Sequence, residues 1–520
     1  SMIEEVSAGE LRTGLDSGTF TVRELAQACL DRIEAMDRTG PALGAVIQIN
    51  PDALTIADEL DAELQDGRSR GPLHGIPVLL KDNIATTDRM QTTAGSLALE
   101  GAVPRKEAFI AERLRAAGAV ILGKTNLSEW ANIRSSSSSS GWSARGGLTV
   151  NPYQLDRTAS GSSSGSAVAV AASYTPLAIG TETNGSISSP SGSCGIVGIK
   201  PTIGLVSRAG IIPISHFQDT AGPMARNVPD AAMLLNAIVG DDPNDPAQHG
   251  PRLESEPSYP ARAAESLPHV DYTSVLDPEG LRGARIGVLR SPLAQSEATQ
   301  EVFGQAIDAL REAGADLVDP LTFPSEQKMT KNRDILSVML WDLKTDLGAY
   351  LRDYVDPEFP IRRLADVVDF NREHAETEMP WFGQDLFEMA LEKGSLDDPA
   401  YLSMVAGVQR LGRTEGIDAL LKEHRLDALV APTNAPASKI DLLNGEHHVG
   451  GSSTPSAIAG YPIVTVPAGY AAGLPIGLSF FGTAYSEPTL IRLAYSFEQA
   501  TQVRHAPAYT APGVLPPEHQ

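Results

Sequence analysis

Apolar residues recur along this chain with two spacings, one typical of amphipathic helices and one typical of short buried strands. Residues 7–37 carry the helical spacing twice, and Thr21 with Glu24 forms a capping box before the second helix. Short apolar runs then alternate with helical segments. The pattern predicts strands at residues 76–81, 119–122, 177–180 and 195–200, and helices at residues 107–117 and 164–172.

The same alternation continues in the second half of the chain, apart from one helical region. Strands are expected at residues 284–289, 315–318, 427–431, 463–467 and 476–481, and helices at residues 300–313 and 487–501. Residues 324–394 have a mainly helical pattern and are rich in aromatic residues and Met. We expect most of these large side chains to pack helices against the sheet, and others to wall a substrate cleft.

Alternating strands and helices predict an α/β fold. We expect a single α/β/α domain, residues 1–520, with a large mixed, mostly parallel β-sheet covered by helices on both faces. The acidic, Pro-rich segment 241–272 is predicted to be a surface loop rather than a linker. The expected parts are an N-terminal helical arm at about 4–70, a core at about 71–320, a helical cleft-covering region at about 324–424, and C-terminal strands with a helix at about 425–505.

The charge balance excludes two classes of partner. The chain has 65 acidic and 41 basic residues and a net charge of −24, which repels the phosphates of nucleic acids and anionic lipids. We therefore expect neither nucleic acid nor a membrane as a partner. The two cysteines, Cys29 and Cys194, are too few for a disulfide framework or a thiolate metal site. No metal and no cofactor is expected.

The cysteine count also suits a reducing cytoplasm, where we expect the protein to work. The chain has no apolar run of about 18 residues, and its first 37 residues are charged throughout, so neither a spanning helix nor a secretory leader is expected. Ser1 before Met2 is typical of a cleavage scar, which leaves open a leader that has been removed.

The first segment with candidate chemistry is an apolar strand, residues 74–83, whose end delivers Lys81 and Asp82 together. A lysine in this place is most often a salt-bridge partner. It acts as a base only where burial and neighbours lower its pKa. A second segment, residues 160–166, is a Gly/Ser-rich turn before a small apolar helix, and a helix N-terminus offers N–H groups to an anion. Taken alone, it is a flexible turn in most proteins.

A third segment, residues 180–190, places Ser186 after a tight polar turn at the carboxyl end of a strand. Ligands of open α/β sheets bind at such strand ends. The consecutive N–H groups of Thr183, Asn184, Gly185 and Ser186 can form an oxyanion nest. On its own, a turn of this kind is more often structural than catalytic.

Together the three segments resemble the amidase signature family. The resemblance covers nearly the whole chain and rests on Gly161-Ser162-Ser163 and on residues 181–186, 194–202, 219–226 and 474–478. Within the family the sequence is most similar to bacterial peptide amidases, through residues 126–132, 140–147 and 212–215. The resemblance implies the fold of this family and the hydrolysis of amide bonds.

Residue by residue, the resemblance places Ser186 at the family's nucleophile, Ser162 at its bridging serine and Lys81 at its terminal base. It implies a cis peptide bond before Ser162, and oxyanion contacts from the backbone of Thr183, Asn184 and Gly185. In the implied chemistry neutral Lys81 draws a proton from Ser162, Ser162 draws one from Ser186, and Ser186 attacks the carbonyl. Further candidates for substrate binding are Asp82, Trp142, Ser163, Asp219, Trp341 and Phe382.

The resemblance to peptide amidases implies a peptide amide substrate whose C-terminal carboxamide is hydrolysed with release of ammonia. Residues 324–394 and the loop 443–454 are expected to wall the cleft. Small-molecule aliphatic or aryl amides, esters and carbamates are alternative substrates. Another alternative is the amidase subunit of a tRNA-dependent amidotransferase, although we expect no obligate partner.

Three positions depart from the common pattern of the family. Glu182 and Asn184 stand where many members carry Asp and Gly, and Ser188 replaces an Arg that often follows the nucleophile. Peptide amidases share the Glu. The Asn184 side chain is expected to narrow the oxyanion turn, so these departures bear on substrate range more than on reaction type.

Other catalytic arrangements are weaker. Residues 161–165 fit the G-x-S-x-G elbow of α/β-hydrolases with Ser163 as nucleophile, but residues 151–158 before it form no strand pattern. A binding module without activity would have lost one of the three family residues, and all are present. Possible triad bases outside any motif are His216, His374, His447, His448 and His505.

Two further segments leave alternatives open. His447 and His448, with Asp441 and Glu446, are a weak signal for a metal site. The six serines at 135–140 are either an ordered loop near the cleft or a flexible segment.

Overall fold

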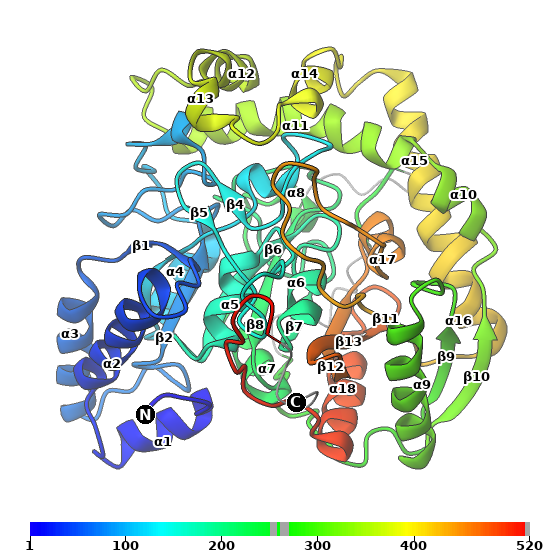
Figure 1. Cartoon of the computed structure of the whole chain (residues 1–520), viewed down its shortest axis with the longest axis horizontal. Coiled ribbons are helices and arrows are strands. Elements are labelled where there is room, and N and C mark those ends of the chain that lie inside the picture. Colours follow the sequence, from blue (N-terminus) through cyan, green and yellow to red (C-terminus); the bar gives the residue numbers. More distant parts are fainter. Residues whose placement is uncertain (250–256, 261–269, 515–520) are drawn as a thin grey trace.

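Eleven strands form one mixed sheet at the centre of the computed structural model, which describes residues 1–249, 257–260 and 270–514 (Figure 1). The strand order is β1-β3-β2-β6-β8-β7-β12-β13-β11-β9-β10. The strands are β1 (Val46–Ile49), β2 (Pro77–Lys81), β3 (Val120–Thr125), β6 (Leu177–Glu182), β7 (Val197–Lys200), β8 (Thr220–Ala225), β9 (Arg285–Leu289), β10 (Asp316–Leu321), β11 (Ala428–Pro432), β12 (Ile463–Ala471) and β13 (Leu474–Phe481). A separate two-stranded sheet contains β4 (Trp142–Ser143) and β5 (Gly147–Leu148).

The prediction of a mixed sheet is confirmed, but the prediction of a mostly parallel one is wrong. Parallel pairing occurs in β2–β3, β2–β6, β11–β9 and β10–β9, whereas the other neighbours run antiparallel. Parallel neighbours need a helical crossover, but β12 and β13 are joined by Ala472 and Gly473 alone. Both residues have positive φ, 48° and 74°, as a tight hairpin turn requires.

Helices cover both faces of the sheet, as predicted. Successive side chains of a strand point to opposite faces. In β11 the side chains of Ala428 and Val430 enter the core shared with α9 and α18, whereas those of Leu429 and Ala431 enter a second core shared with α16 and α17. These four helices are α9 (Glu297–Glu312), α16 (Asp418–His424), α17 (Thr454–Ala459) and α18 (Glu487–Thr501).

The remaining helices form the N-terminal arm, the layer over the sheet and the helical region. They are α1 (Ala8–Asp16), α2 (Val22–Ile33), α3 (Ala53–Gln65), α4 (Phe109–Ala116), α5 (Ser164–Ala171), α6 (Ser188–Ser193), α7 (Val228–Ile238), α8 (Pro246–His249), α10 (Glu326–Lys331), α11 (Asp334–Tyr354), α12 (Leu364–Glu373), α13 (Ala375–Glu378), α14 (Asp385–Leu391) and α15 (Pro399–Gly412). Short 3-10 or π segments lie at Leu97–Leu99, Glu129–Asn132, Glu34–Arg38 and Arg413–Ile417.

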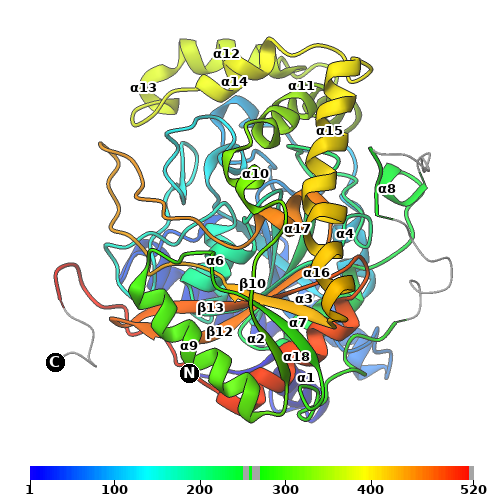
Figure 2. The same ribbon diagram turned by 90° about the vertical axis from the view of Figure 1, so that its right-hand side faces the viewer.

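Helices α11, α12, α13 and α14 lie together at one end of the molecule, at the top of Figures 1 and 2. They share a core of their own in which Leu340, Leu343 and Leu347 of α11 pack with Leu127 and Trp130 from the segment after β3. This helical region therefore rests on the segment that follows β3, the second strand from one edge of the sheet. Its prediction as a mainly helical region is confirmed.

The pattern located most elements to within a few residues, and the capping box at Thr21 is present. It missed the edge strand β1, the central strand β8 and helices α3 and α7. The predicted loop at 241–272 lies partly outside the described residues. None of the described helices combines the length and the apolar character that crossing a membrane requires.

Candidate active site

Lys81 is the last residue of β2, a buried strand that lies between β3 and β6 in the sheet. Strand β2 runs parallel to β3 on one side and β6 on the other, so the carboxyl ends of β2 and β6 lie next to each other. Lys81 is fully buried. Its Nζ atom lies 2.7 Å from Ser162 Oγ, 3.0 Å from Ser163 Oγ and 2.8 Å from Thr181 Oγ1. Strand β6 thus supplies one partner of the lysine, and the turn before α5 supplies two.

Burial lowers the pKa of Lys81 from 10.5 to about 7, although the negative charges of Asp219 and Glu182 oppose this shift. An ammonium group loses its hydration when it is buried, which favours the neutral amine. Lys81 forms no ion pair in the described part of the chain, and its partners are hydroxyl and carbonyl oxygens. A substantial fraction of this lysine is therefore a free base at neutral pH.

The two serines beside Lys81 lie in the turn that begins α5. The peptide bond between Gly161 and Ser162 is cis, as the resemblance implied. Ser163 is held firmly, because its hydroxyl donates to the Thr181 carbonyl at 3.0 Å and accepts the Thr181 N–H at 3.1 Å. The Ser162 hydroxyl has Lys81 as its one hydrogen-bond partner among the described residues. Of the two, Ser162 is free to exchange a proton.

Ser186 follows the turn that leaves β6. The Ser163 N–H donates to the Ser186 carbonyl at 3.1 Å, which ties the two serine segments together. Ser186 is only partly buried, whereas Ser162 is fully buried. Within the described chain the Ser186 hydroxyl makes no hydrogen bond, so it is available to a ligand.

The backbone N–H groups of the turn at Ser186 have no acceptor within the described residues. Gly185 has φ of 91°, a conformation that glycine tolerates best. The N–H groups of Asn184, Gly185 and Ser186 donate to no acceptor among the described residues, and such unpaired N–H groups suit an oxyanion. The Asn184 side chain does not fill this turn, because its Oδ1 accepts from Ser453 Oγ at 2.7 Å instead.

Asp219 supports the start of the same turn. Its Oδ1 accepts from the Thr183 hydroxyl at 2.5 Å, and its Oδ2 accepts from the N–H groups of Ile214 and Ser215. Burial raises the pKa of Asp219 to about 6, although these hydrogen bonds oppose the rise. Asp219 is therefore a carboxylate that holds the backbone, and it also borders the cavity described below.

The other candidates for substrate binding have side-chain partners other than Lys81. Asp82 is buried and pairs with Arg145 through Oδ2 at 3.1 Å. Trp142 and Phe382 form an edge-to-face pair with centroids 5.5 Å apart. Trp341 stacks on Tyr401, with ring centroids 5.4 Å apart, inside the helical region. These contacts account for the four side chains by packing or ion pairing.

Arg134 joins the helical region to the core beside this aromatic pair. Its guanidinium lies 4.2 Å from the centre of the Phe382 ring. It pairs with Glu129 and with Glu378 of α13, and it donates to the carbonyl of Phe382 at 3.0 Å. All of the charged groups in this cluster are buried.

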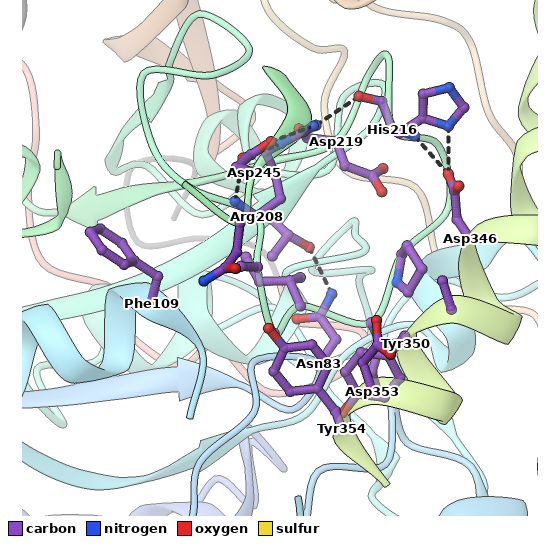
Figure 3. Close-up of a pocket in the computed structure, with 18 of the residues that line it drawn as sticks. Asn83, Phe109, Arg208, His216, Asp219, Asp245, Asp346, Tyr350, Asp353 and Tyr354 are labelled. Atoms are coloured by element: carbon purple, nitrogen blue, oxygen red, sulfur yellow. Dashed lines mark hydrogen bonds and ion pairs between the residues drawn. The ribbon is translucent and has the colours of Figure 1, made fainter. Parts of the chain in front are cut away.

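A cavity of about 830 Å³ borders the strand end that carries Thr181 (Figure 3). Its lining includes Thr181 and Thr183 but not Lys81, Ser162 or Ser186. Tyr350 and Tyr354 of α11 also line it, so part of the region expected to wall a cleft does line a cavity.

Sequence reasoning gave no role to two residues that contact this centre. Thr181 Oγ1 lies between Lys81 Nζ and Asn83 Nδ2, which donates to it at 3.0 Å. Asn83 follows Lys81 by two residues, and Thr181 opens the segment that contains Ser186. Both belong to segments singled out by the sequence, but the contact depends on how strands β2 and β6 pair.

None of the alternative histidines approaches this centre in the contacts observed. His216 pairs with Asp346 at 2.8 Å, His374 stacks on Phe370 and His505 stacks on Tyr470. His447 and His448 are exposed. Asp441 and Glu446, proposed beside them as metal ligands, bind different partners: Asp441 caps its own turn, and Glu446 binds Ser140 and Thr158.

The chain is similar to known proteins over most of its length. A family model described as "Amidase" matches residues 24–491. The fold is similar to the crystal structure of native peptide amidase from Stenotrophomonas maltophilia, with a TM-score of 0.89 and 49% identity over 97% of this chain and 99% of that chain. A relative from Arabidopsis thaliana, named "Probable amidase", is 40% identical over 98% of this chain and 92% of its own length. A glutamyl-tRNA(Gln) amidotransferase subunit from Chloroflexus aurantiacus is 35% identical over 94% of this chain and 96% of its own length.

Proposed function

The chain belongs to the amidase signature family of amide-hydrolysing enzymes, and we propose that within it the protein removes C-terminal amide groups from peptides as ammonia, using Lys81, Ser162 and Ser186. The contact that carries this proposal is the 2.7 Å hydrogen bond between Lys81 Nζ and Ser162 Oγ. It joins a lysine whose pKa burial lowers to about 7 to the one hydroxyl beside it that has no other partner in the described chain.

The hydrogen-bond pattern around Lys81 sets the direction of proton transfer. A neutral amine has two N–H donors and one lone pair. Ser163 Oγ already gives its proton to the Thr181 carbonyl, so it can only accept from Lys81. The lone pair is then open to the Ser162 hydroxyl, which is also the nearest partner. Lys81 therefore acts on Ser162 as a general base.

The reaction proceeds through an acyl-enzyme. The Ser186 hydroxyl loses its proton to Ser162 as its oxygen attacks the amide carbonyl, and the Lys81 amine takes the Ser162 proton. The N–H groups of Asn184, Gly185 and Ser186 stabilise the oxyanion. When the C–N bond breaks, the proton returns through Ser162 to the leaving nitrogen, which departs as ammonia. Water then attacks the ester by the same route, releases the acid and restores the Ser186 hydroxyl.

The peptide amide is proposed because of two observations. One crystal structure that matches this fold over almost its full length is that of a peptide amidase. Trp142, which forms an aromatic pair with Phe382, also follows Ser140 by two residues, and the Cβ of Ser140 lies 3.4 Å from the position of a Cβ on Gly161. Large aromatic rings suit an acyl chain. An enzyme for terminal amides needs room for the acyl part and a small site for the –NH2 leaving group.

The experiment compares an N-protected dipeptide amide, the matching longer peptide acid and an anilide, with ammonia and new acid followed by mass spectrometry. The proposal expects ammonia from the dipeptide amide and no cleavage of the internal peptide bonds of the acid. Faster turnover of the anilide, or of a carbamate, would overturn the assignment to peptide amides and leave the catalytic residues unchallenged.

A second candidate function follows from the amidotransferase relatives, in which the corresponding chain is a subunit. We propose instead that this chain works without a partner subunit. Ammonia release by the purified chain alone separates the two: a partner-dependent subunit gives none, whereas an independent amidase gives ammonia at a rate proportional to enzyme concentration.

A further inference from the structure

The six serines at 135–140 are an ordered loop that holds two carboxylates. At its first end the Ser135 hydroxyl donates to Asp385 at the start of α14, at 2.6 Å. At its last end the Ser140 hydroxyl donates to Glu446 Oε2 at 2.7 Å. The loop therefore connects the helical region with the loop 443–454, the two segments that the sequence predicted as cleft walls.

Glu446 lies close to the peptide that carries Ser162. A Cβ atom on Gly161, the residue before Ser162, would lie 3.4 Å from the Cβ of Ser140, which binds Glu446. The other carboxylate oxygen of Glu446 accepts from Thr158 Oγ1 at 3.2 Å. Glu446 is therefore held by Ser140, and Ser140 lies against the turn that carries Ser162.

The loop 443–454 also reaches the turn that carries Ser186, through Ser453, which follows Glu446 by seven residues. Ser453 Oγ donates to Asn184 Oδ1 at 2.7 Å, and a Cβ on Gly185 would lie 3.0 Å from it. Residues 446–453 thus run from the neighbour of Ser162 to the neighbour of Ser186. The loop 443–454 therefore holds its carboxylate beside the turn of Ser162 and a hydroxyl beside the turn of Ser186.

No positive charge in the described chain neutralises Glu446. It forms no ion pair there, and its hydrogen-bond partners are the two hydroxyls of Ser140 and Thr158. The basic residues of the neighbouring segments are engaged elsewhere: Arg157 donates to the Ala437 carbonyl, and Lys439 pairs with Asp156 at 3.6 Å. The side chain of Glu446 is also partly exposed, so a ligand can approach it.

We propose that Glu446 is a specificity-determining residue that selects amide substrates with a positive charge near the scissile group. This inference rests on the proposed function and names its substrate class. Two parts of a substrate can supply the charge, namely the α-ammonium of an unprotected amino-acid or peptide amide and the side chain of a basic residue. A charge pair with the partly exposed carboxylate of Glu446 favours such substrates in KM, because the contact forms already in the enzyme–substrate complex.

The test uses three amides at pH 7: N-acetyl-leucinamide, which is neutral, leucinamide, which carries the α-ammonium, and N-acetyl-argininamide, which carries a side-chain cation. Wild-type enzyme is expected to show kcat/KM about tenfold higher for at least one cationic amide than for the neutral one. The cationic amide with the higher kcat/KM identifies which part of the substrate supplies the charge. In Glu446→Gln the preference is expected to vanish through a rise in KM, with the neutral amide changed by less than about twofold.

Asp441→Asn is the matched control, because it removes one exposed charge just before the loop 443–454 without touching Ser140 or Thr158. It should keep the preference. A wild-type enzyme without preference, or a preference that survives Glu446→Gln, would overturn the inference. Absence of ammonia from all three amides would instead count against the proposed function, and the charge comparison would then be made with benzamide and 4-(aminomethyl)benzamide.

Discussion

Glu182 and Ser188 are joined by two hydrogen bonds, since Glu182 Oε1 accepts from the Ser188 N–H at 2.8 Å and from the Ser188 hydroxyl at 2.9 Å. The N–H of Ile187 donates to the same oxygen at 2.9 Å. Both residues replace the types that many family members carry, so two departures that look separate in the sequence are in contact. Together they fix the backbone on both sides of Ser186.

Shortening Glu182 tests this connection. Glu182→Asp removes one methylene, so the carboxylate no longer reaches all three donors beyond Ser186. We expect kcat to fall about tenfold with KM within about twofold, because lost hydrogen bonds to a charged group are each worth about 1.5–3 kcal/mol, which a shifted backbone recovers in part. Ser188→Ala removes only the hydrogen bond from the Ser188 hydroxyl, so its kcat should fall less than that of Glu182→Asp. Equal effects of the two changes on kcat would contradict this role.

Replacing the nucleophile should abolish turnover. Ser186→Ala is expected to lower kcat by at least about 10⁴-fold, because covalent catalysis is lost, and to leave the melting temperature almost unchanged, because the hydroxyl has no partner in the described chain. Ammonia release and thermal unfolding measure the two effects. If Ser186→Ala retains more than about a hundredth of the wild-type rate, another residue is the nucleophile. Ser162→Ala should be slowed strongly but less completely, since water can take its place.

Activity should rise with pH through the titration of Lys81. The free amine is the active form, and its fraction increases as pH passes the folded pKa of about 7. A pH profile of kcat/KM on an amide that does not titrate should therefore show an acid limb with an apparent pKa near that value. Lys81→Met should remove nearly all activity at every pH. An acid limb that persists in residual Lys81→Met activity would point to a different base.

Removing the same lysine should also stabilise the fold. The pKa of Lys81 is lower in the folded than in the unfolded chain, so the unfolded chain binds more protons between about pH 7 and 10.5. The cost of burying this amine is therefore largest below about pH 7 and declines as pH rises toward 10.5. Lys81→Met is expected to raise the free energy of unfolding by about 2 kcal/mol at about pH 6, after loss of the hydrogen bonds, and by less at about pH 9. Chemical denaturation of both proteins at the two pH values measures the difference in the free energy of unfolding. A stabilisation by Lys81→Met that increases with pH would contradict the prediction.

Arg134 should be among the most sensitive residues of the helical region. Arg134→Met leaves the carboxylates of Glu129 and Glu378 buried without their cation, which typically costs about 3–5 kcal/mol. We expect denaturant unfolding to show a loss of this order in the free energy of unfolding. Hydrogen exchange should accelerate more in α13 and α14 than in β2 and β6 on going from wild type to Arg134→Met.

Arg372→Met is the matched control for this substitution. It removes a guanidinium from the same helical region, but its pairs with Asp369 and Glu388 are exposed. It should therefore cost less than about 1 kcal/mol. Similar losses from Arg134→Met and Arg372→Met would show that the buried cluster does not hold the helical region in place.

Most strands and helices could be predicted because their apolar spacing is regular. Strand β8, Thr-Ala-Gly-Pro-Met-Ala, escaped because Gly222 and Pro223 are unusual in a central strand. A Cβ at Gly222 would lie 1.9 Å from the Ile199 carbonyl, so close approach to β7 requires this glycine. Strand directions were also missed, since apolar spacing is the same for parallel and antiparallel neighbours.

The residues of the candidate centre could be predicted from the family resemblance. The contacts that support them could not. Lys81, Ser162 and Ser186 lie in segments of distinctive composition, whereas the contact of Ser140 with Glu446 joins residues 306 positions apart in ordinary loops. Nothing in the local sequence of Glu446 marks its partner. The pairing of β2 with β6, which places Thr181 beside Lys81, is likewise a property of the assembled sheet.

The reacting residues all come from β2, the turn before α5 and the turn after β6, within residues 81–186, whereas α11 to α14 and the loop 443–454 come from much later in the chain. The proposed reaction and the proposed selectivity are therefore encoded in separable stretches of the gene. Chimeras that exchange residues 324–394 or 443–454 between relatives should transfer substrate preference while keeping the pH profile set by the lysine. Recombination within a family built in this way can explore new substrates without rebuilding its chemistry.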